Sequence, residues 1–136
     1  MQLELLSTAW LCLLLALLGL RTSFFRLGGE YGSKGPKDPD GMAARFQRAH
    51  GNLSEWIGAY AALCIISSDV VLGARGPLAE FAGYVAAAGA VGITVHRAGM
   101  IILGLRQFHW TKMAGMTTFY LAIVGLGVRC LVGLAQ

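Results

Sequence analysis

The sequence predicts an all-α protein, an integral membrane four-helix bundle. Hydrophobic residues make up 56% of its 136 residues and charged residues only 13%, whereas a soluble domain carries about a quarter charged residues. Long stretches without a charged side chain follow one another along the chain, and most lysines and arginines fall in two of the connections between them. Lipid must therefore face much of the chain, which leaves no room for a separate soluble domain.

The uncharged stretches run from Leu5 to Leu20, Trp56 to Ser68, Phe81 to Val95 and Met113 to Val128. Each is shorter than the roughly 20 residues that a helix needs to cross the hydrocarbon layer. The helices must therefore include flanking polar residues, which face other helices or reach toward the interface. We expect a single domain over residues 1–136, with spans at about 3–26, 43–73, 78–104 and 112–134.

Two stretches have an alternative interpretation. The first resembles a signal peptide, but its beginning, MQLE, lacks a positive charge and no small-residue cleavage site follows, so we expect it to remain as a helix. The third, FAGYVAAAGAVGITV, is rich in small residues, which let helix backbones approach closely in lipid. It predicts close packing inside the bundle, with an oligomer interface as the alternative.

The basic residues predict the orientation in the membrane. Of the eleven, only Arg75 and Arg129 lie away from the first and third connections and their borders. The positive-inside rule then places those connections in the cytoplasm and both termini outside, and we expect a bacterial inner membrane. The net charge of +4 needs no nucleic-acid partner, and the three cysteines lack metal-ligand spacing, so no metal site is expected.

The polar segment ARFQRAHGNLSEW, residues 44–56, leads into the second stretch. A helix places four of its residues in a stripe about 100° wide: Arg45, Arg48, Asn52 and Glu55. His50 falls on the other side, where we expect an interfacial or interhelical hydrogen bond. Glu55 begins the apolar stretch, so it needs a cation or a polar cavity.

The stripe has a structural and a functional interpretation. An ion pair between Arg48 and Glu55, or between helices, would only stabilise the bundle. Two arginines, an amide and a carboxylate exceed what one ion pair requires. The surplus predicts a ligand that carries carboxylates and an ammonium group.

The segment RFQRAHGNLSEW resembles the second-helix signature of the MAPEG family, the membrane-associated proteins in eicosanoid and glutathione metabolism, which reads approximately R-x-x-R-A-H-x-N-x-x-E-[YN]-x-P. The order of four spans with a long first connection and a short third one is similar as well. The resemblance implies a homotrimer that binds glutathione between neighbouring subunits near the cytosolic face. It also implies a lipophilic second substrate that enters from membrane lipid.

The resemblance further implies a role for individual residues. Lys112 is the best match to the basic residue that activates the thiol at the start of the fourth helix, and Arg106 is the alternative. A nearby positive charge favours the thiolate. From the residues alone, Lys112 is equally a helix-end anchor and His96 an interhelical hydrogen-bonding group. The implied glutathione-binding residues are Arg45, Arg48, Asn52, Glu55 and His96.

Several positions depart from the family pattern. Ile93 stands where the third-helix pattern A-R-x-x-[HY]-x-x-G has its arginine. Arg97 points about 100° away from His96, so we expect that it does not simply substitute. Trp56 replaces the usual tyrosine and lacks its hydroxyl group, and Gly58 replaces the usual proline.

The implied function is a glutathione-dependent transferase or peroxidase that acts on lipophilic electrophiles or hydroperoxides. Glutathione would be its co-substrate. Two alternatives are a non-catalytic relative whose polar stripe is structural and a small proton-coupled exporter that uses Glu55. The generic apolar side chains that face lipid do not define the second substrate.

Overall fold

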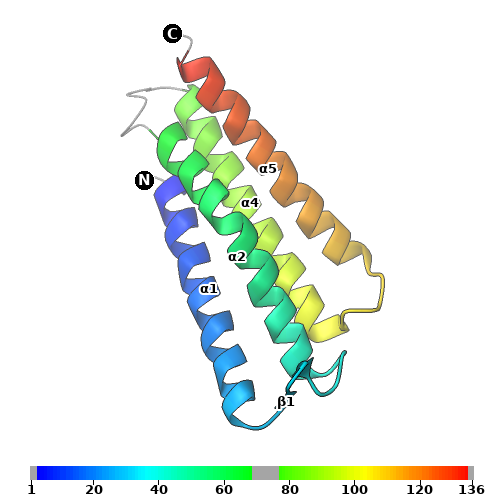
Figure 1. Ribbon diagram of the computed structural model, residues 1–136. Helices are drawn as coiled ribbons and strands as arrows, with labels where there is room; N and C mark the ends of the chain where they lie inside the picture. Colours follow the sequence, from blue (N-terminus) through cyan, green and yellow to red (C-terminus); the bar gives the residue numbers. More distant parts are fainter. Residues whose placement is uncertain (1–2, 69–76, 135–136) are drawn as a thin grey trace.

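The computed structural model describes residues 3–68 and 77–134 of the chain. Four long helices lie side by side as a bundle (Figure 1), which confirms the predicted fold class. A short antiparallel hairpin of β1 (Tyr31–Gly32) and β2 (Gly35–Pro36) interrupts the first connection. The helices are α1 (Leu3–Leu27), α2 (Met42–Ser67), α4 (Pro77–Leu103) and α5 (Trp110–Leu134).

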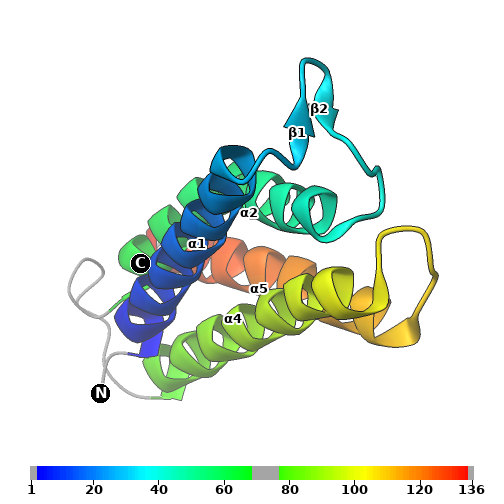
Figure 2. The same ribbon diagram turned by 90° about the horizontal axis from the view of Figure 1, so that it is seen from below.

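The helix ends lie close to the expected span limits, except at the end of α2. This helix ends at Ser67, and Ser68 has extended backbone with its N–H donated to the carbonyl of Ile65. The expected second span ran to residue 73; residues 69–73 lie outside the described residues. Figure 2, viewed from below, shows the hairpin and the α4–α5 connection at the same end of the bundle.

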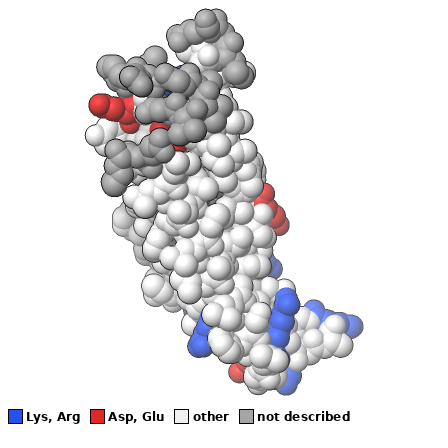
Figure 3. Space-filling view, turned by 90° about the vertical axis from the view of Figure 1, so that its left-hand side faces the viewer, with Lys and Arg blue, Asp and Glu red and all other residues white. Residues whose placement is uncertain are grey.

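The outer surface of the bundle suits a membrane. Among the described residues, three helical segments are long and apolar enough to cross one: Leu3–Leu27, Ala79–Leu103 and Trp110–Gly133. α2 is as long, at 26 residues, but its first half carries the polar stripe. On the face shown in Figure 3, lysine and arginine gather at the end that carries the hairpin, and the flank above is largely uncharged.

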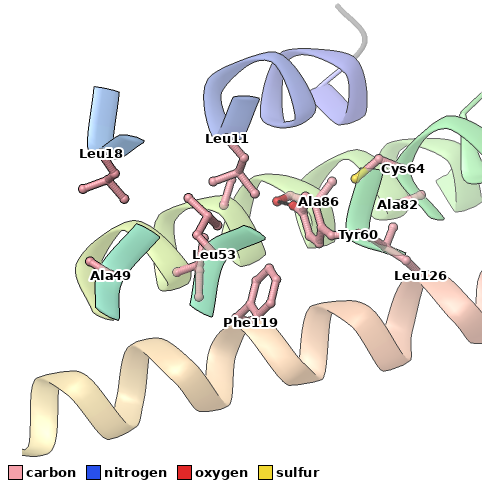
Figure 4. Packing of buried hydrophobic residues seen from close by; sticks show 12 residues of the cluster. Leu11, Leu18, Ala49, Leu53, Tyr60, Cys64, Ala82, Ala86, Phe119 and Leu126 are labelled. Carbon is pink, nitrogen blue, oxygen red and sulfur yellow. Dashed lines mark hydrogen bonds between the residues drawn. The ribbon is translucent and has the colours of Figure 1, made fainter. Parts of the chain in front are cut away.

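The core forms where the four helices meet (Figure 4). Leu11 of α1, Leu53 of α2 and Phe119 of α5 are fully buried there. Tyr60 packs its ring 5.2 Å from that of Phe119 and donates its hydroxyl hydrogen to the carbonyl of Ala86 on α4. This hydrogen bond satisfies the one polar group of a side chain that is otherwise apolar.

Two glycines lie where α4 and α5 approach each other closely. A Cβ atom on Gly115 would lie 2.5 Å from the carbonyl oxygen of Gly92, and one on Gly92 would lie 2.7 Å from that of Gly115. The same Gly115 Cβ would lie 2.9 Å from the backbone nitrogen of His96. The close packing predicted from the small residues is confirmed, and it sets the start of α5 against the last turns of α4.

Candidate functional site

A pocket of about 390 Å³ lies at the end of the bundle that carries the hairpin and the α4–α5 connection. α2, α4, the α4–α5 connection and the start of α5 all contribute to its wall. Apolar side chains, among them Met100, Leu105 and Phe108, share that wall with polar ones. The predicted site residues that line it are Arg48, Asn52, His96, Arg106 and Lys112.

Helical spacing explains how two of the elements reach the pocket. Arg48 and Asn52 are four residues apart on α2, so they lie one turn apart on the same face. His96 and Met100 have the same spacing on α4, and both line the same pocket. The site is therefore formed by two regular helices rather than by a loop alone.

His96 links α4 to the first turn of α5. Its Nδ1 atom lies 2.7 Å from the carbonyl oxygen of Lys112. Because a carbonyl only accepts, Nδ1 carries the hydrogen in this contact. The interhelical hydrogen bond expected for His96 is confirmed, while its contact with a ligand stays a prediction.

Lys112 is 9% exposed and its ammonium group is engaged by the protein. Nζ donates to the carbonyl oxygen of Gly104 at 3.0 Å and also to that of Gln107. Its stem crosses α4 at Gly99, where a Cβ atom would lie 2.8 Å from the Lys112 Cγ. The positive charge thus stabilises the carboxyl end of α4 instead of reaching toward the interface as a helix-end anchor would. The role of Lys112 in thiol activation stays a prediction.

Arg45 contacts the same helix end from α2. Its Nε donates to the backbone carbonyl of Asp40 at 2.7 Å, and Nη1 donates to the carbonyl of Ile101 at 3.1 Å. The Asp40 carboxylate, 3.6 Å from Arg45 Nε, accepts the N–H of Leu105 at 2.8 Å. We call this group the Arg45–Asp40 clasp, and it joins the first connection to the end of α4.

Breaking the clasp is expected to weaken the bundle. Arg45→Ala removes two side-chain hydrogen bonds and leaves the Ile101 carbonyl without its donor, so we expect the free energy of unfolding to fall by about 1–3 kcal/mol. Thermal unfolding followed by circular dichroism in detergent measures the change. Lys37→Ala, an exposed substitution in the same connection, is the control. Equal unfolding midpoints for the two variants would argue against the clasp.

Two members of the predicted site lie outside this pocket. Arg45 serves the clasp, and Glu55 is exposed on α2. The possible ion pair between Arg48 and Glu55 is not formed, because the salt bridge found among the described residues joins Arg45 and Asp40. His50, expected to make an interfacial or interhelical bond, packs against α1, where a Cβ on Gly19 would lie 3.0 Å from its Nε2.

The departures from the family pattern have structural explanations. Trp56 packs edge to face against Tyr120 of α5, with the ring centroids 5.3 Å apart. α2 runs without a break through Gly58, whose surroundings are open. Ile93 is fully buried in the core.

Arg97, which was not expected in the site from the sequence, is deeply buried on α4. It is 1% exposed, and its Nε and Nη2 atoms have no hydrogen-bond partner among the described residues. Arg97 follows Ile93 by four residues, so both lie on one face of α4. This four-residue spacing places Arg97 one helical turn from the position where the family pattern has its arginine. The angle between Arg97 and the adjacent His96 does not reveal this relation.

A second pocket of about 490 Å³ shares Arg48 and Asn52 with the first. It is bounded by the first connection and by the beginning of α2, with Lys34 and Gln47 among its lining residues. The polar stripe of α2 therefore borders two spaces at once. An elongated polar ligand has room on both sides of these two side chains.

Comparison with known proteins identifies one family. The model of the MAPEG family matches residues 5–135, nearly the whole chain. No curated protein and no solved structure matches it.

Proposed function

Since the chain belongs to the MAPEG family, we propose that it is a membrane-bound transferase or peroxidase that uses glutathione. Membership makes it a membrane protein of the family of glutathione and eicosanoid metabolism. The observation that carries the proposal is the shared pocket of Arg48, Asn52, His96 and Arg106 at one end of the bundle. Four polar groups of three chemical kinds in one cavity favour a ligand over a structural ion pair.

The chemistry of glutathione suits this pocket. The tripeptide carries two carboxylates, which the guanidinium groups of Arg48 and Arg106 match with paired hydrogen bonds. The Asn52 amide both donates and accepts, as a peptide group requires. The second pocket, with Lys34 at its edge, offers space for one arm of the ligand.

A lipophilic co-substrate would reach the thiol from the membrane. An apolar groove of about 490 Å³ runs between α4 and α5 and is lined by Val91, Val95, Trp110 and Ala114. The groove and the first pocket meet at the start of α5: Thr111 lines the groove, and the next two residues, Lys112 and Met113, line the pocket. An electrophile or an organic hydroperoxide held in the groove would therefore lie near the glutathione site.

We further propose that three copies of the chain assemble as a homotrimer, with the glutathione site between neighbouring subunits. Glu55 lies on the helix that lines the pocket but is exposed and outside it. A neighbouring subunit packed on this face would cover Glu55 and let it contact the ammonium group of the ligand. Chemical cross-linking in detergent tests this assembly, with a trimer expected and a monomer contradicting it.

Turnover tests the proposed function. Purified protein in detergent micelles is expected to accelerate reaction of glutathione with a lipophilic aryl chloride or reduction of an organic hydroperoxide, with saturation in glutathione. Rates equal to those of empty micelles with both substrate classes would contradict an enzyme. A proton-coupled exporter would instead respond to a pH gradient, and vesicles containing the protein distinguish it.

A further inference from the structure

Arg97 carries a buried charge whose hydrogen-bonding capacity is mostly unused. Its Nη1 atom donates to the sulfur of Met100 at 3.5 Å, and sulfur is a weak acceptor. Nε and Nη2 have no partner among the described residues. An unpaired charge inside a membrane bundle costs stability, and such residues are functional by default.

The surroundings do not neutralise this charge directly. The titratable groups coupled to Arg97 by charge include Tyr120 of α5, Glu55 of α2 and the adjacent His96 of α4. Glu55 is exposed and makes no salt bridge with it, and Tyr120 packs against Trp56. Within the described part of the chain, two nitrogen atoms of the guanidinium, Nε and Nη2, therefore remain free to donate to another acceptor.

Met100 connects this charge to the pocket. Its side chain lines the pocket and its sulfur contacts the guanidinium. His96, which precedes Arg97, lines the same pocket. Methionine has flexible torsions and rearranges at low cost, so Met100 is the side chain that a pocket ligand would have to displace to reach Arg97.

We propose that Arg97 is the catalytic residue that stabilises the thiolate of glutathione, by donating to its sulfur once Met100 has turned aside. This inference rests on the proposed function. In the step, the S–H bond breaks, the sulfur keeps the electron pair and the proton leaves to solvent water. Arg97 suits this role better than Lys112, whose ammonium is bound by two carbonyls, or Arg106, whose exposed charge is screened by water.

The pH midpoint of thiolate formation tests the assignment. Glutathione is added to the detergent-solubilised protein, the ultraviolet thiolate absorbance is followed against pH, and affinity is measured by calorimetry. In Arg97→Met we expect the midpoint to rise by about 1–3 pH units, because a nearby positive charge is lost. At a pH below both midpoints, where the bound thiol is protonated in either protein, we expect affinity to change less than about threefold, since the carboxylate contacts remain; above the wild-type midpoint, affinity is expected to fall in step with the lost thiolate stabilisation.

Two further variants distinguish the effect of the Arg97 charge from an effect on folding. Arg97→Lys keeps the positive charge and is expected to restore most of the midpoint shift. Arg97→Gln is a second neutral variant, which decides the question if the methionine variant does not fold. Because methionine replaces a buried unpaired charge, Arg97→Met is expected to be at least as stable as the wild type.

The possible failures are distinguishable. An unchanged thiolate midpoint in the folded neutral variants, with glutathione still bound, overturns the role of Arg97 and leaves the proposed function standing. A lower unfolding temperature with an unchanged midpoint shows a structural role and also overturns the assignment. Absence of glutathione binding by the wild type overturns both proposals.

Discussion

Gly115→Ala is expected to destabilise the bundle by about 3 kcal/mol, at the upper end for added core volume. The new methyl group would lie 2.5 Å from the carbonyl oxygen of Gly92 and 2.9 Å from the backbone nitrogen of His96. These are backbone atoms, which cannot swing aside as a flexible side chain does. α4 and α5 must therefore separate, and their contact near the pocket is disturbed.

The same helix supplies a matched control. Gly127 has open space where a Cβ would be placed, so Gly127→Ala is expected to stabilise the protein by about 0.5–1 kcal/mol through helix propensity. Thermal unfolding of both variants in one detergent gives the comparison. Similar midpoints for the two would show that α4 and α5 are not held together at these glycines.

Arg48→Ala is expected to raise the Kd for glutathione by at least about 30-fold, which corresponds to roughly 2 kcal/mol. The substitution removes a guanidinium that borders both pockets and leaves a ligand carboxylate without its charged donor. The stability of the protein should change little, because Arg48 is exposed and Arg45, not Arg48, makes the clasp. Calorimetric titration measures the affinity.

Arg26→Ala removes the same charge outside the pockets. Arg26 is exposed near the end of α1, and its guanidinium lies 5.4 Å from the centre of the Tyr31 ring. Its loss is expected to leave the Kd within about twofold of the wild type, because solvent screens the Arg26 guanidinium from the charges of bound glutathione. Equal losses in both variants would mean that a diffuse basic surface, rather than a pocket, attracts glutathione.

The fold followed from the sequence because the membrane constrains it. Long apolar stretches between charged flanks admit few solutions, and helices satisfy their own backbone hydrogen bonds in lipid. The small residues around Gly92 predicted close packing, although the sequence did not show that Gly115 would be the partner. The end of α2 depends on local capping at Ser68, which composition does not reveal.

The candidate site was only partly predictable. Helical periodicity placed Arg48 and Asn52 on one face, and the structure adds His96 and Arg106 to the same pocket. Periodicity within α2 could not show that Arg45 reaches the carbonyl of Ile101 on α4, because that contact is made between distant parts of the chain.

The contacts of the basic residues near α5 could not be predicted from the sequence either. Lys112 lines the pocket, but its bonds to backbone carbonyls arise from the path of the α4–α5 connection, which the sequence does not reveal. Arg97 was not expected to replace the family arginine, because its direction around the helix axis differs by about 100° from that of the adjacent His96. Comparison with Ile93 places it on the core face, where its burial makes it a candidate for chemistry.

Calorimetric titration of reduced glutathione into the purified wild-type protein tests the central claim most directly. We expect saturable binding at the shared pocket, which weakens at high salt because arginine–carboxylate contacts contribute. Free cysteine, which lacks the second carboxylate and the tripeptide backbone, should bind far more weakly. Absence of saturable glutathione binding to folded protein would contradict the account and leave the polar stripe with a structural role.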